Sequence, residues 1–285
     1  MLSSYLLSLR EGLEAALIIG IVLGTLRKIQ RPNLTSVVWY GVFSAIAVSL
    51  ISALLLTIYG LSLEGKTEAI FEGITMLLAA GILTWMIFWM SRQAQAIKIN
   101  LEDGVHQATE GSGKRTLFWL AFMAVLREGI ELALFLTAAV FTSGVQQAAT
   151  GALLGLGTAI LLGWSLFTTS IHLDLSRFFQ VTGLLLILFA AGLVANGIHE
   201  FNEIGWIPVI IEHVWDINTI VNENSPLGEM LKALFGYNSN PSLSELAAYL
   251  IYYVVLFLGI RRKETFFGYL RKKDEPAVEI KVNRP

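Results

Sequence analysis

The chain of 285 residues contains no cysteine and only six prolines, and charged residues make up 15% of it. Without cysteine, the protein has no disulfide bonds, no thiolate metal ligands and no cysteine redox chemistry. The sequence also has no glycine-rich phosphate loop and no serine nucleophile motif, so ATP hydrolysis would have to be supplied by another chain. A net charge of −2 gives no reason to expect a nucleic-acid partner.

Apolar residues, by contrast, make up 55% of the chain, and the mean hydropathy is +0.65. A membrane-spanning helix needs about 20 apolar residues, and the apolar runs here are continuous, without the alternation of a membrane β-barrel. We therefore predict an all-α polytopic membrane protein. The first run carries charges and no basic segment precedes it, so we expect a retained helix rather than a cleaved signal peptide. The seven predicted transmembrane helices cover residues 5–26, 37–59, 68–90, 117–141, 149–171, 178–201 and 242–260.

The basic residues of the predicted loops are divided unequally between the two sides of the membrane. Sixteen of the 20 Lys and Arg residues fall on one side, and only Lys66 and Lys232 on the other. The positive-inside rule then places the N-terminus outside and the C-terminus in the cytoplasm, in the cell (cytoplasmic) membrane. We treat residues 1–285 as one membrane domain. Its parts are a first repeat (1–90), a cytoplasmic loop (91–116), a second repeat (117–201), an extracytoplasmic loop (202–241), a last helix (242–260) and a cytoplasmic tail (261–285).

A five-residue charged motif occurs twice within the apolar runs. It reads Arg-Glu-Gly-Leu-Glu at residues 10–14 and Arg-Glu-Gly-Ile-Glu at residues 127–131. A charged side chain at bilayer depth costs roughly 3 to more than 10 kcal/mol, so such residues usually face a polar interior and mark an ion pathway. Each motif lies in the first of three successive helices, and three is an odd number. The pattern therefore predicts two inverted three-helix repeats, followed by a seventh helix.

The motif spacing predicts a metal site. On a helix with about 100° per residue, the arginine and the last glutamate of each motif lie one turn apart and can pair. Two facing motifs then hold four carboxylates against two guanidinium groups, a hard oxygen site suited to Fe(III), Mn, Mg or Ca. The alternative is a set of static buried ion pairs. The predicted metal ligands are Glu11, Glu14, Glu128 and Glu131, and the supporting residues are Arg10 and Arg127.

A second group of polar residues is expected at the external ends of helices three and six. Two glutamates one turn apart begin helix three, and a polar face ends helix six. These side chains would form a vestibule that concentrates cations; the alternative is two solvated helix ends. The predicted residues are Glu68 and Glu72, as further metal ligands, and Asn196, His199, Glu200 and Glu203. A weaker candidate in the acidic outer loop consists of Glu212, His213 and Asp216.

The double motif and the glutamate-rich third helix resemble the oxidase-dependent iron permease family. That family includes fungal high-affinity iron permeases and the bacterial permease of the Efe uptake system. The sequence Leu-Phe-Gly-Tyr-Asn at residues 234–238 is similar to the bacterial branch. The second motif departs from the usual pattern only in Ile130, a conservative change.

The resemblance implies that the chain is a transporter rather than an enzyme, with iron as the transported substrate and no organic cofactor. It also implies that the motif glutamates are ligands on the path, that Glu72 is another functional carboxylate, and that an extracytoplasmic iron-oxidising or iron-delivering protein is a partner. Three alternatives stay open: a permease for lead or another divalent metal such as manganese, an intramembrane ferroxidase, and a structural scaffold. The sequence does not fix the oligomeric state.

Overall fold

A computed structural model describes residues 1–110, 113–168, 175–209, 211, 214–218, 222 and 225–273. Side chains are described for these residues except 89–100, 102, 106–110, 167–168, 175–176, 226, 229, 233–234 and 260–273. Over this part of the chain every regular element is helical, which confirms the predicted all-α class. The helices are α1 (Leu2–Lys28), α2 (Thr35–Leu61), α3 (Lys66–Glu110), α4 (Lys114–Ser143), α5 (Val145–Thr168), α6 (Leu175–Glu203), α7 (Pro226–Phe235) and α8 (Leu243–Lys273), with a 3-10 turn η1 (Pro32–Leu34).

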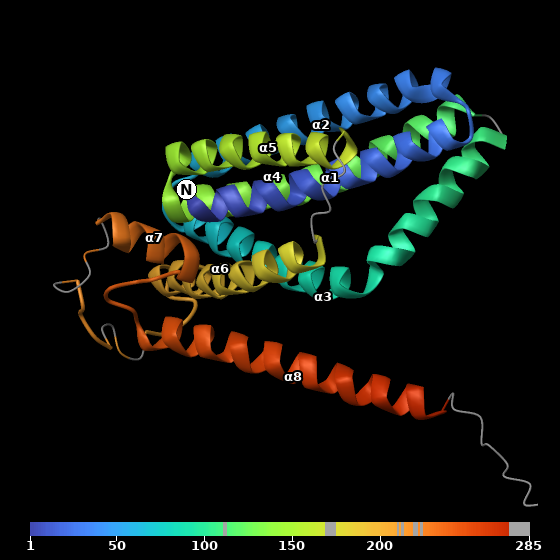
Figure 1. Ribbon diagram of the computed structural model, residues 1–285. Coiled ribbons are helices and arrows are strands. Elements are labelled where there is room, and N and C mark those ends of the chain that lie inside the picture. Colours follow the sequence, from blue (N-terminus) through green and yellow to red (C-terminus); the bar gives the residue numbers. More distant parts are fainter. Residues whose placement is uncertain are drawn as a thin grey trace, which may run out of the picture.

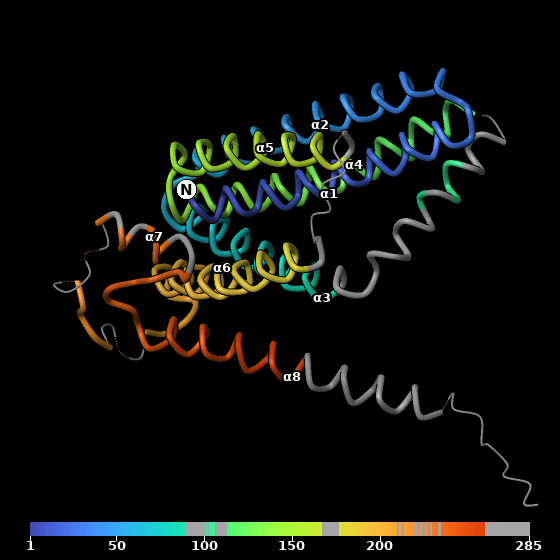
Figure 2. The backbone as a smooth tube through the Cα atoms, in the orientation of Figure 1, coloured from blue at the N-terminus to red at the C-terminus, as the bar shows by residue number. Residues whose placement is uncertain are grey.

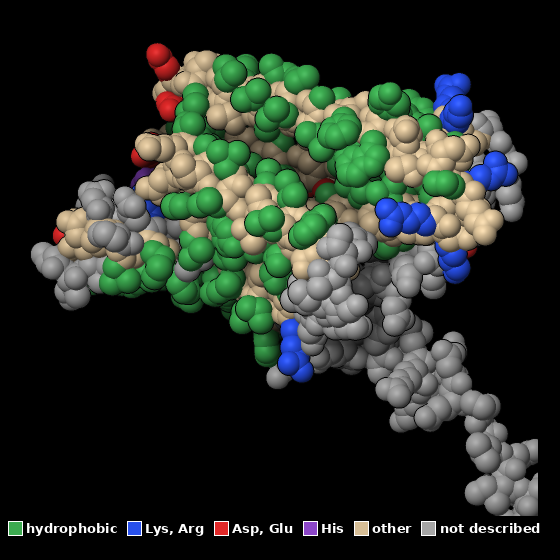
Figure 3. Space-filling model, turned by 45° about the horizontal axis from the view of Figure 1, so that its top comes forward, with side chains coloured by type: hydrophobic (Ala, Val, Ile, Leu, Met, Phe, Trp, Pro, Cys, Tyr) green, Lys and Arg blue, Asp and Glu red, His purple; other side chains and the backbone are tan. Residues whose placement is uncertain are grey.

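The long helices form one bundle. Figure 1 shows α1, α2, α4 and α5 lying side by side, α3 and α6 packed together next to them, and α8 beyond α6. The tube in Figure 2 shows the same arrangement, with α1 close to α4 and α5. We call the end where α1 and α3 begin and where α4 and α6 end the acidic end of the bundle, and the opposite end the basic end. Figure 3 shows that acidic and histidine side chains gather mainly at the first and basic side chains mainly at the second.

Several helices are long and apolar enough to cross a bilayer. Four qualify over Pro32–Leu61, Lys66–Phe88, Val145–Leu166 and Arg177–Glu203, and a shorter apolar helix covers Leu243–Gly259. Helices α1 and α4, of 27 and 30 residues, have the required length but carry the charged motifs. At about 1.5 Å per residue each exceeds the ~30 Å of a hydrocarbon core. The chain is thus a multi-pass membrane protein, and the count of seven spans stays a prediction.

Two helices extend beyond their predicted ends. We expected a polar loop from residue 91 to 116, with at most a short amphipathic helix around Leu101 and Val105, but α3 continues to Glu110. Helix α8 likewise runs to Lys273, through the start of the expected tail. The bilayer sets only the minimum length of a helix, and neither extension contains a proline that would stop it. In the first extension, Leu101 and the fully buried Val105 pack into an apolar cluster with Leu26 and Leu34.

The predicted extracytoplasmic loop contains one helix that we did not expect. Helix α7 starts after Ser225, whose Oγ accepts a hydrogen bond from the Gly228 backbone N–H at 3.0 Å, and Pro226 occupies the first turn. It ends at Gly236, which has a left-handed φ of +62°. Serine followed by proline at the start and glycine after the end is a known helix signature, so the sequence did carry a signal for α7.

Small residues let the main helix pairs approach closely. A Cβ atom added to Gly155 of α5 would collide with the backbone of α1 at the Tyr5 carbonyl, and would lie 2.9 Å from the Leu9 backbone nitrogen. On the other side of the bundle, a Cβ atom at Gly41 of α2 would lie 2.7 Å from the Phe118 carbonyl oxygen of α4. In a membrane, close backbone packing of this kind is a main source of helix association. The backbones of α1 and α5, and those of α2 and α4, are therefore held close together.

This packing predicts different tolerance at two glycines of α5. Gly155→Leu should destabilise the protein by about 1–3 kcal/mol, because the added atoms meet rigid backbone of α1. Gly157→Leu is the matched control, since an added Cβ atom there meets nothing within 4 Å. The midpoint of thermal unfolding in detergent would measure both. Equal midpoints for the two variants would contradict the close α1–α5 contact.

Candidate metal centre

Three motif glutamates meet where α1 and α4 cross. Carboxylate oxygens of Glu11, Glu128 and Glu131, one from each residue, all lie within 4.8 Å of one another. Glu11 and Glu128 are almost inaccessible, with exposures of 1% and 6%. Two helices from distant parts of the sequence therefore bring three carboxylates into one buried cluster, which we call the central site.

The motif glycines explain why the carboxylates of the two helices face each other. A Cβ atom at Gly12 would lie 2.7 Å from the Ala159 Cβ atom of α5, and one at Gly129 would collide with the Ser49 side chain of α2. Gly12 thus faces α5 and Gly129 faces α2, and both of these helices lie on the outside of the α1–α4 pair. The glutamates beside each glycine are then turned toward the other motif.

Both arginines pair with the last glutamate of their own motif, as the spacing predicts. The Arg10 Nε donates a hydrogen bond to Glu14 Oε1 at 3.1 Å, and the Arg127 Nε donates to Glu131 Oε1 at 3.0 Å. Their surroundings differ. The Arg10 side chain is 1% exposed, whereas that of Arg127 is 41% exposed. One arginine is therefore sealed inside the bundle and the other is accessible.

Several carboxylate oxygens of the central site lack a hydrogen-bond donor. Both oxygens of Glu11, Oε2 of Glu128 and Oε2 of Glu131 are buried and have no hydrogen-bond partner among the described residues. A buried, unsatisfied polar atom is costly, and a buried charge needs a counter-charge or a metal. Carboxylate oxygens without nitrogen or sulfur ligands suit hard cations. The geometry is thus that of a cation site made entirely of oxygen.

The fourth predicted ligand, Glu14, is not one of the three clustered residues. It is held by Arg10, and it interacts electrostatically with both Glu11 and Glu131. The structure therefore separates the four glutamates into three that converge and one that lies beside them. A ligand role for Glu14 stays a prediction.

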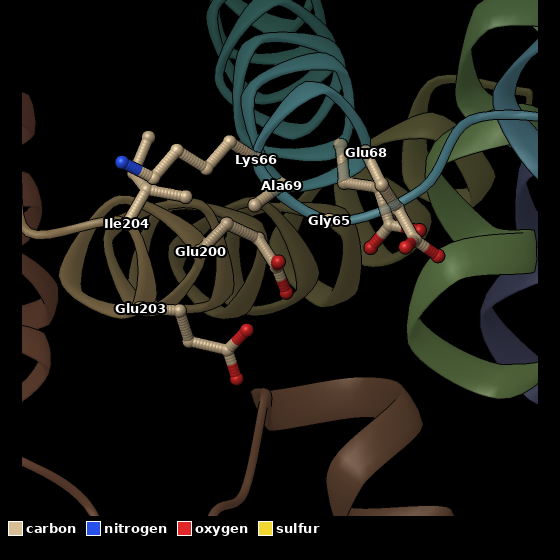
Figure 4. A pocket seen from close by; sticks show the side chains of 8 residues that line it. Gly65, Lys66, Glu68, Ala69, Glu200, Glu203 and Ile204 are labelled. Atoms are coloured by element: carbon tan, nitrogen blue, oxygen red, sulfur yellow. The ribbon is translucent and has the colours of Figure 1, made fainter.

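A cavity of about 410 Å³ opens between the start of α3 and the end of α6. We call it the acidic pocket. Figure 4 shows Glu68 on α3 and Glu200 and Glu203 on α6 beside the same space. The helices approach closely here, because a Cβ atom at Gly73 would lie 3.1 Å from the Gly197 carbonyl oxygen. The pocket is lined by Gly65, Lys66, Glu68, Ala69, Glu72, Glu200, Glu203 and Ile204. It holds all four glutamates that we predicted for the vestibule.

The other two predicted vestibule residues lie elsewhere. Asn196 is half-buried and does not line the pocket. His199 bridges two glutamates: its Nδ1 lies 2.9 Å from Glu245 Oε1, and its Nε2 lies 3.4 Å from Glu203 Oε1. Sequence reasoning missed Glu245 as part of this region. The signal was the spacing Ser-x-x-Glu at residues 242–245, which is a helix capping box.

The weaker candidate in the outer loop gains nothing from the structure. Glu212 and His213 lie outside the described residues. Asp216 uses its Oδ1 to accept a hydrogen bond from the Asn218 backbone N–H at 3.0 Å. Asp216 is the only one of the three candidates that the structure describes, and this local turn explains the position of its carboxylate.

An apolar layer separates the acidic pocket from the central site. Leu7 and Phe135 lie one turn from Glu11 and Glu131 toward the acidic end, and Met76 lies one turn from Glu72 toward the basic end. All three are buried in one cluster with Phe189 and Leu193. Along the helices, this apolar cluster therefore lies between the levels of the acidic pocket and the central site.

Membrane-length helices around a buried carboxylate cluster define a multi-pass membrane protein with a candidate cation site. Comparison with known proteins gives the family: the chain belongs to the iron permease FTR1 family, whose model matches residues 1–263. This confirms the resemblance seen in the motifs.

Individual relatives match over most of the chain. The ferrous iron permease EfeU of Escherichia coli O6:K15:H31 is 36% identical over 252 residues, which is 88% of this chain and 91% of the relative. The ferrous iron permease EfeU of Yersinia pestis is 35% identical over 252 residues, 88% of this chain and 89% of the relative. A putative inactive ferrous iron permease EfeU of E. coli K12 is also similar, at 36% identity over 252 residues, with 88% and 91% of the two chains covered. No solved structure matches.

The central site predicts an unusual stability effect. Glu11→Gln should stabilise the metal-free protein by about 1–3 kcal/mol, because it removes one of three crowded carboxyl groups whose ionised forms repel one another. The same change should reduce the stabilisation that added Mn(II) gives to the unaltered protein, because a metal ligand is lost. Thermal unfolding of purified protein with and without Mn(II) would measure both effects. Glu64→Gln, at an exposed position, is the control.

Static buried ion pairs would give the opposite result. In that case Glu11→Gln would lower the unfolding midpoint of the metal-free protein, and Mn(II) would have no effect on either protein.

Proposed function

We propose that this protein is an iron permease that imports iron across the cytoplasmic membrane, with Glu11, Glu128 and Glu131 as ligands at the centre of the path and Glu14 joining them during transport. One observation carries the proposal: three carboxylates from α1 and α4 converge, two of them on buried residues, and four of their oxygens are buried without a hydrogen-bond partner in the described part of the chain. Iron as the cargo is supported by the family match and by relatives named as ferrous iron permeases.

Charge balance fits a metal cation. The two motifs together carry four carboxylates and two guanidinium groups, a net charge of −2. A divalent cation neutralises this charge, so loading the site removes the repulsion between the glutamates. Manganese and lead also accept oxygen ligands, so a permease for a divalent metal other than iron is the alternative.

The helix pairing supports two inverted repeats, α1–α3 and α4–α6. If the helices correspond in order, α1 corresponds to α4 and α2 to α5. Contact of α1 with α5 then has its counterpart in contact of α4 with α2, and both are present. Exchanging the two repeats also turns the α1–α4 pair into itself and the α3–α6 pair into itself. Contacts within both of these pairs are present as well. An axis in the membrane plane would bring the two motifs together at mid-depth.

The charge distribution supports an N-terminus outside the cell and a C-terminus in the cytoplasm. The acidic end of the bundle would face outward and the basic end inward, as the positive-inside rule requires. The acidic pocket would then collect iron at the outer surface, from an extracytoplasmic iron-oxidising or iron-delivering protein. Iron would pass the apolar layer only when the helices rearrange, as in alternating access.

The unequal exposure of the two arginines supports release toward the cytoplasm. Arg127 lies on the basic-end side of Glu131, whereas Arg10 lies on the acidic-end side of Glu14. The first is 41% exposed and the second 1%. This asymmetry fits an inward-accessible state better than an outward-accessible one.

Iron loading of proteoliposomes tests the proposal. Glu11→Gln, Glu14→Gln and Glu131→Gln should each lower the initial rate at least about tenfold, because losing 1.4 kcal/mol of binding free energy weakens binding tenfold. Each oxidation state of iron should be held fixed in separate experiments. Glu64→Gln is the control, since this residue is exposed and lies outside both acidic sites.

Three results would contradict the proposed iron permease function. Full uptake by Glu14→Gln would support a static scaffold role for the motif pairs. Iron uptake lost to an excess of lead or manganese would support the divalent alternative. Oxidation of Fe(II) by purified protein that does not load liposomes would support an intramembrane ferroxidase.

The acidic pocket should act through its electric field. The double variant Glu68→Gln, Glu72→Gln should lower iron uptake about threefold at low salt and much less at 0.5 M salt, because screening weakens attraction between exposed charges. Uptake rates at several ionic strengths would measure this. An effect of the same size at every salt concentration would contradict electrostatic collection.

A further inference from the structure

Helix α7 enters the acidic end of the bundle and ends among the long helices. Figure 1 shows it between the start of α1 and the end of α6, and it contacts α1, α4 and α6. The central site lies between α1 and α4, which are two of the three helices that α7 touches. Helix α7 therefore covers the side of the α1–α4 crossing that faces the acidic end.

The last residues of α7 reach the level of the apolar layer. A Cβ atom at Gly192 of α6 would lie 2.6 Å from the Gly236 Cα atom and 3.1 Å from the Phe235 carbonyl carbon. Gly192 lies about 16 Å along α6 from its last residue, Glu203, at 1.5 Å per residue. The next residue, Leu193, belongs to the apolar layer. The chain thus dips into the bundle and turns back at Gly236, where the left-handed φ of +62° favours glycine.

One face of α7 is turned toward the bundle. Gly228 is buried, and Leu231 and Phe235, one and two turns further along, are half-buried. Leu227 and Met230 are 52% and 43% exposed. A helix of ten residues with so narrow a contact face gains little free energy from packing. Elements of this kind open at a lower free energy than the core of a protein does.

This excursion of the chain is hydrogen-bonded at its base, whereas α7 is held against the bundle by packing. At the base, the backbone N–H groups of Val214 and Ile217 donate to the carbonyl oxygens of Pro241 and Ser239 at 3.1 and 3.0 Å. Among the α7 side chains that the structure describes, none makes a hydrogen bond or an ion pair with α1, α4 or α6. A helix that is tied at its base and only packed at its tip can move as a unit.

We propose that α7 is an outer lid, which swings away from α1, α4 and α6 to open the central site toward the acidic end and closes that side in the observed state. The unequal exposure of Arg127 and Arg10 fits a central site that is open toward the basic end, and α7 covers the opposite side. Alternating access requires one closed side at a time. The role of the lid in transport rests on the proposed iron permease function, but its cover over the α1–α4 crossing does not.

The alternative is a static brace. In that case α7 would fill the space between the three helices permanently, and Leu7 in the apolar layer would stay inaccessible whether or not iron is transported. Both explanations predict that a forced displacement of α7 uncovers buried residues. A comparison of resting with transporting protein therefore separates them.

Cysteine labelling tests the lid, because the chain has no cysteine of its own. Leu7→Cys places one thiol in the apolar layer, at a position with 0% exposure. A membrane-impermeant maleimide added outside cells should label it about fivefold faster during Fe(II) import than in iron-free medium, because the lid opens in each cycle. Leu26→Cys, equally buried at the basic end, is the control and should stay unlabelled under both conditions.

Forced displacement of the lid gives a second readout, which needs no transport. Gly192→Val sets side-chain atoms against the Gly236 backbone, so in detergent it should speed the labelling of Leu7→Cys about tenfold. Gly183→Val is the matched control on the same helix, since a Cβ atom there meets only Ile87 Cγ2, at 3.6 Å. It should leave the labelling rate unchanged. Circular dichroism would show that both variants are folded.

Either of two results overturns the inference. One is equal labelling of Leu7→Cys at rest and during iron import, which a static brace predicts. The other is equal labelling in Gly192→Val and Gly183→Val. Failure of the proposed function looks different: iron loading of proteoliposomes would then be unaffected by Glu11→Gln, while Gly192→Val would still uncover Leu7→Cys in detergent.

Discussion

Mutual repulsion of buried carboxylates is the constraint around which this bundle is built. Glu11, Glu128 and Glu131 meet in an interior of low dielectric constant, where like charges repel strongly. The attraction that holds α1 and α4 in place must therefore come from elsewhere. Close packing supplies it, because Gly12 lies against α5 and Gly129 against α2. Tight helix pairs on the outside of the motifs thus hold together a cluster that repulsion between ionised carboxylates would otherwise separate.

The proposed ion path divides its tasks between two kinds of acidic site. The acidic pocket has exposed carboxylates on Glu68 and Glu203, which in the proposed permease would attract cations at little cost in desolvation. The central site has the buried carboxylates of Glu11 and Glu128, which would bind through direct coordination. The apolar layer around Phe135 and Met76 keeps the two apart. A continuous acidic channel would let ions and protons leak in either direction. In the proposed permease, two acidic sites with an apolar layer between them would require a conformational step for each ion.

Much of this organisation could be predicted from the sequence, and the remainder depends on tertiary contacts. The lengths of the apolar runs predicted helices long enough to cross a membrane, and the repeated motif identified carboxylates that the structure brings together. Helix α7 and the Glu245 cap had local signals, in Ser225 with Gly236 and in the Ser-x-x-Glu spacing, which a reading focused on apolar runs passes over. No local signal separates Glu14 from Glu11. Both lie on the same side of one helix, and only the position of α4 decides that Glu11 is the one that converges with Glu128.

The two arginines show most clearly that tertiary contacts decide what local sequence cannot. Arg10 and Arg127 occupy equivalent places in nearly identical motifs, make the same i, i+4 hydrogen bond, and still differ from 1% to 41% in exposure. Local sequence cannot produce this difference. In antiparallel helices, however, the two arginines lie on opposite sides of the carboxylates along the membrane normal. In the proposed permease, their exposures would report which side of the central site is open, and a rearrangement that sealed Arg127 and uncovered Arg10 would turn the same site toward the other face of the membrane.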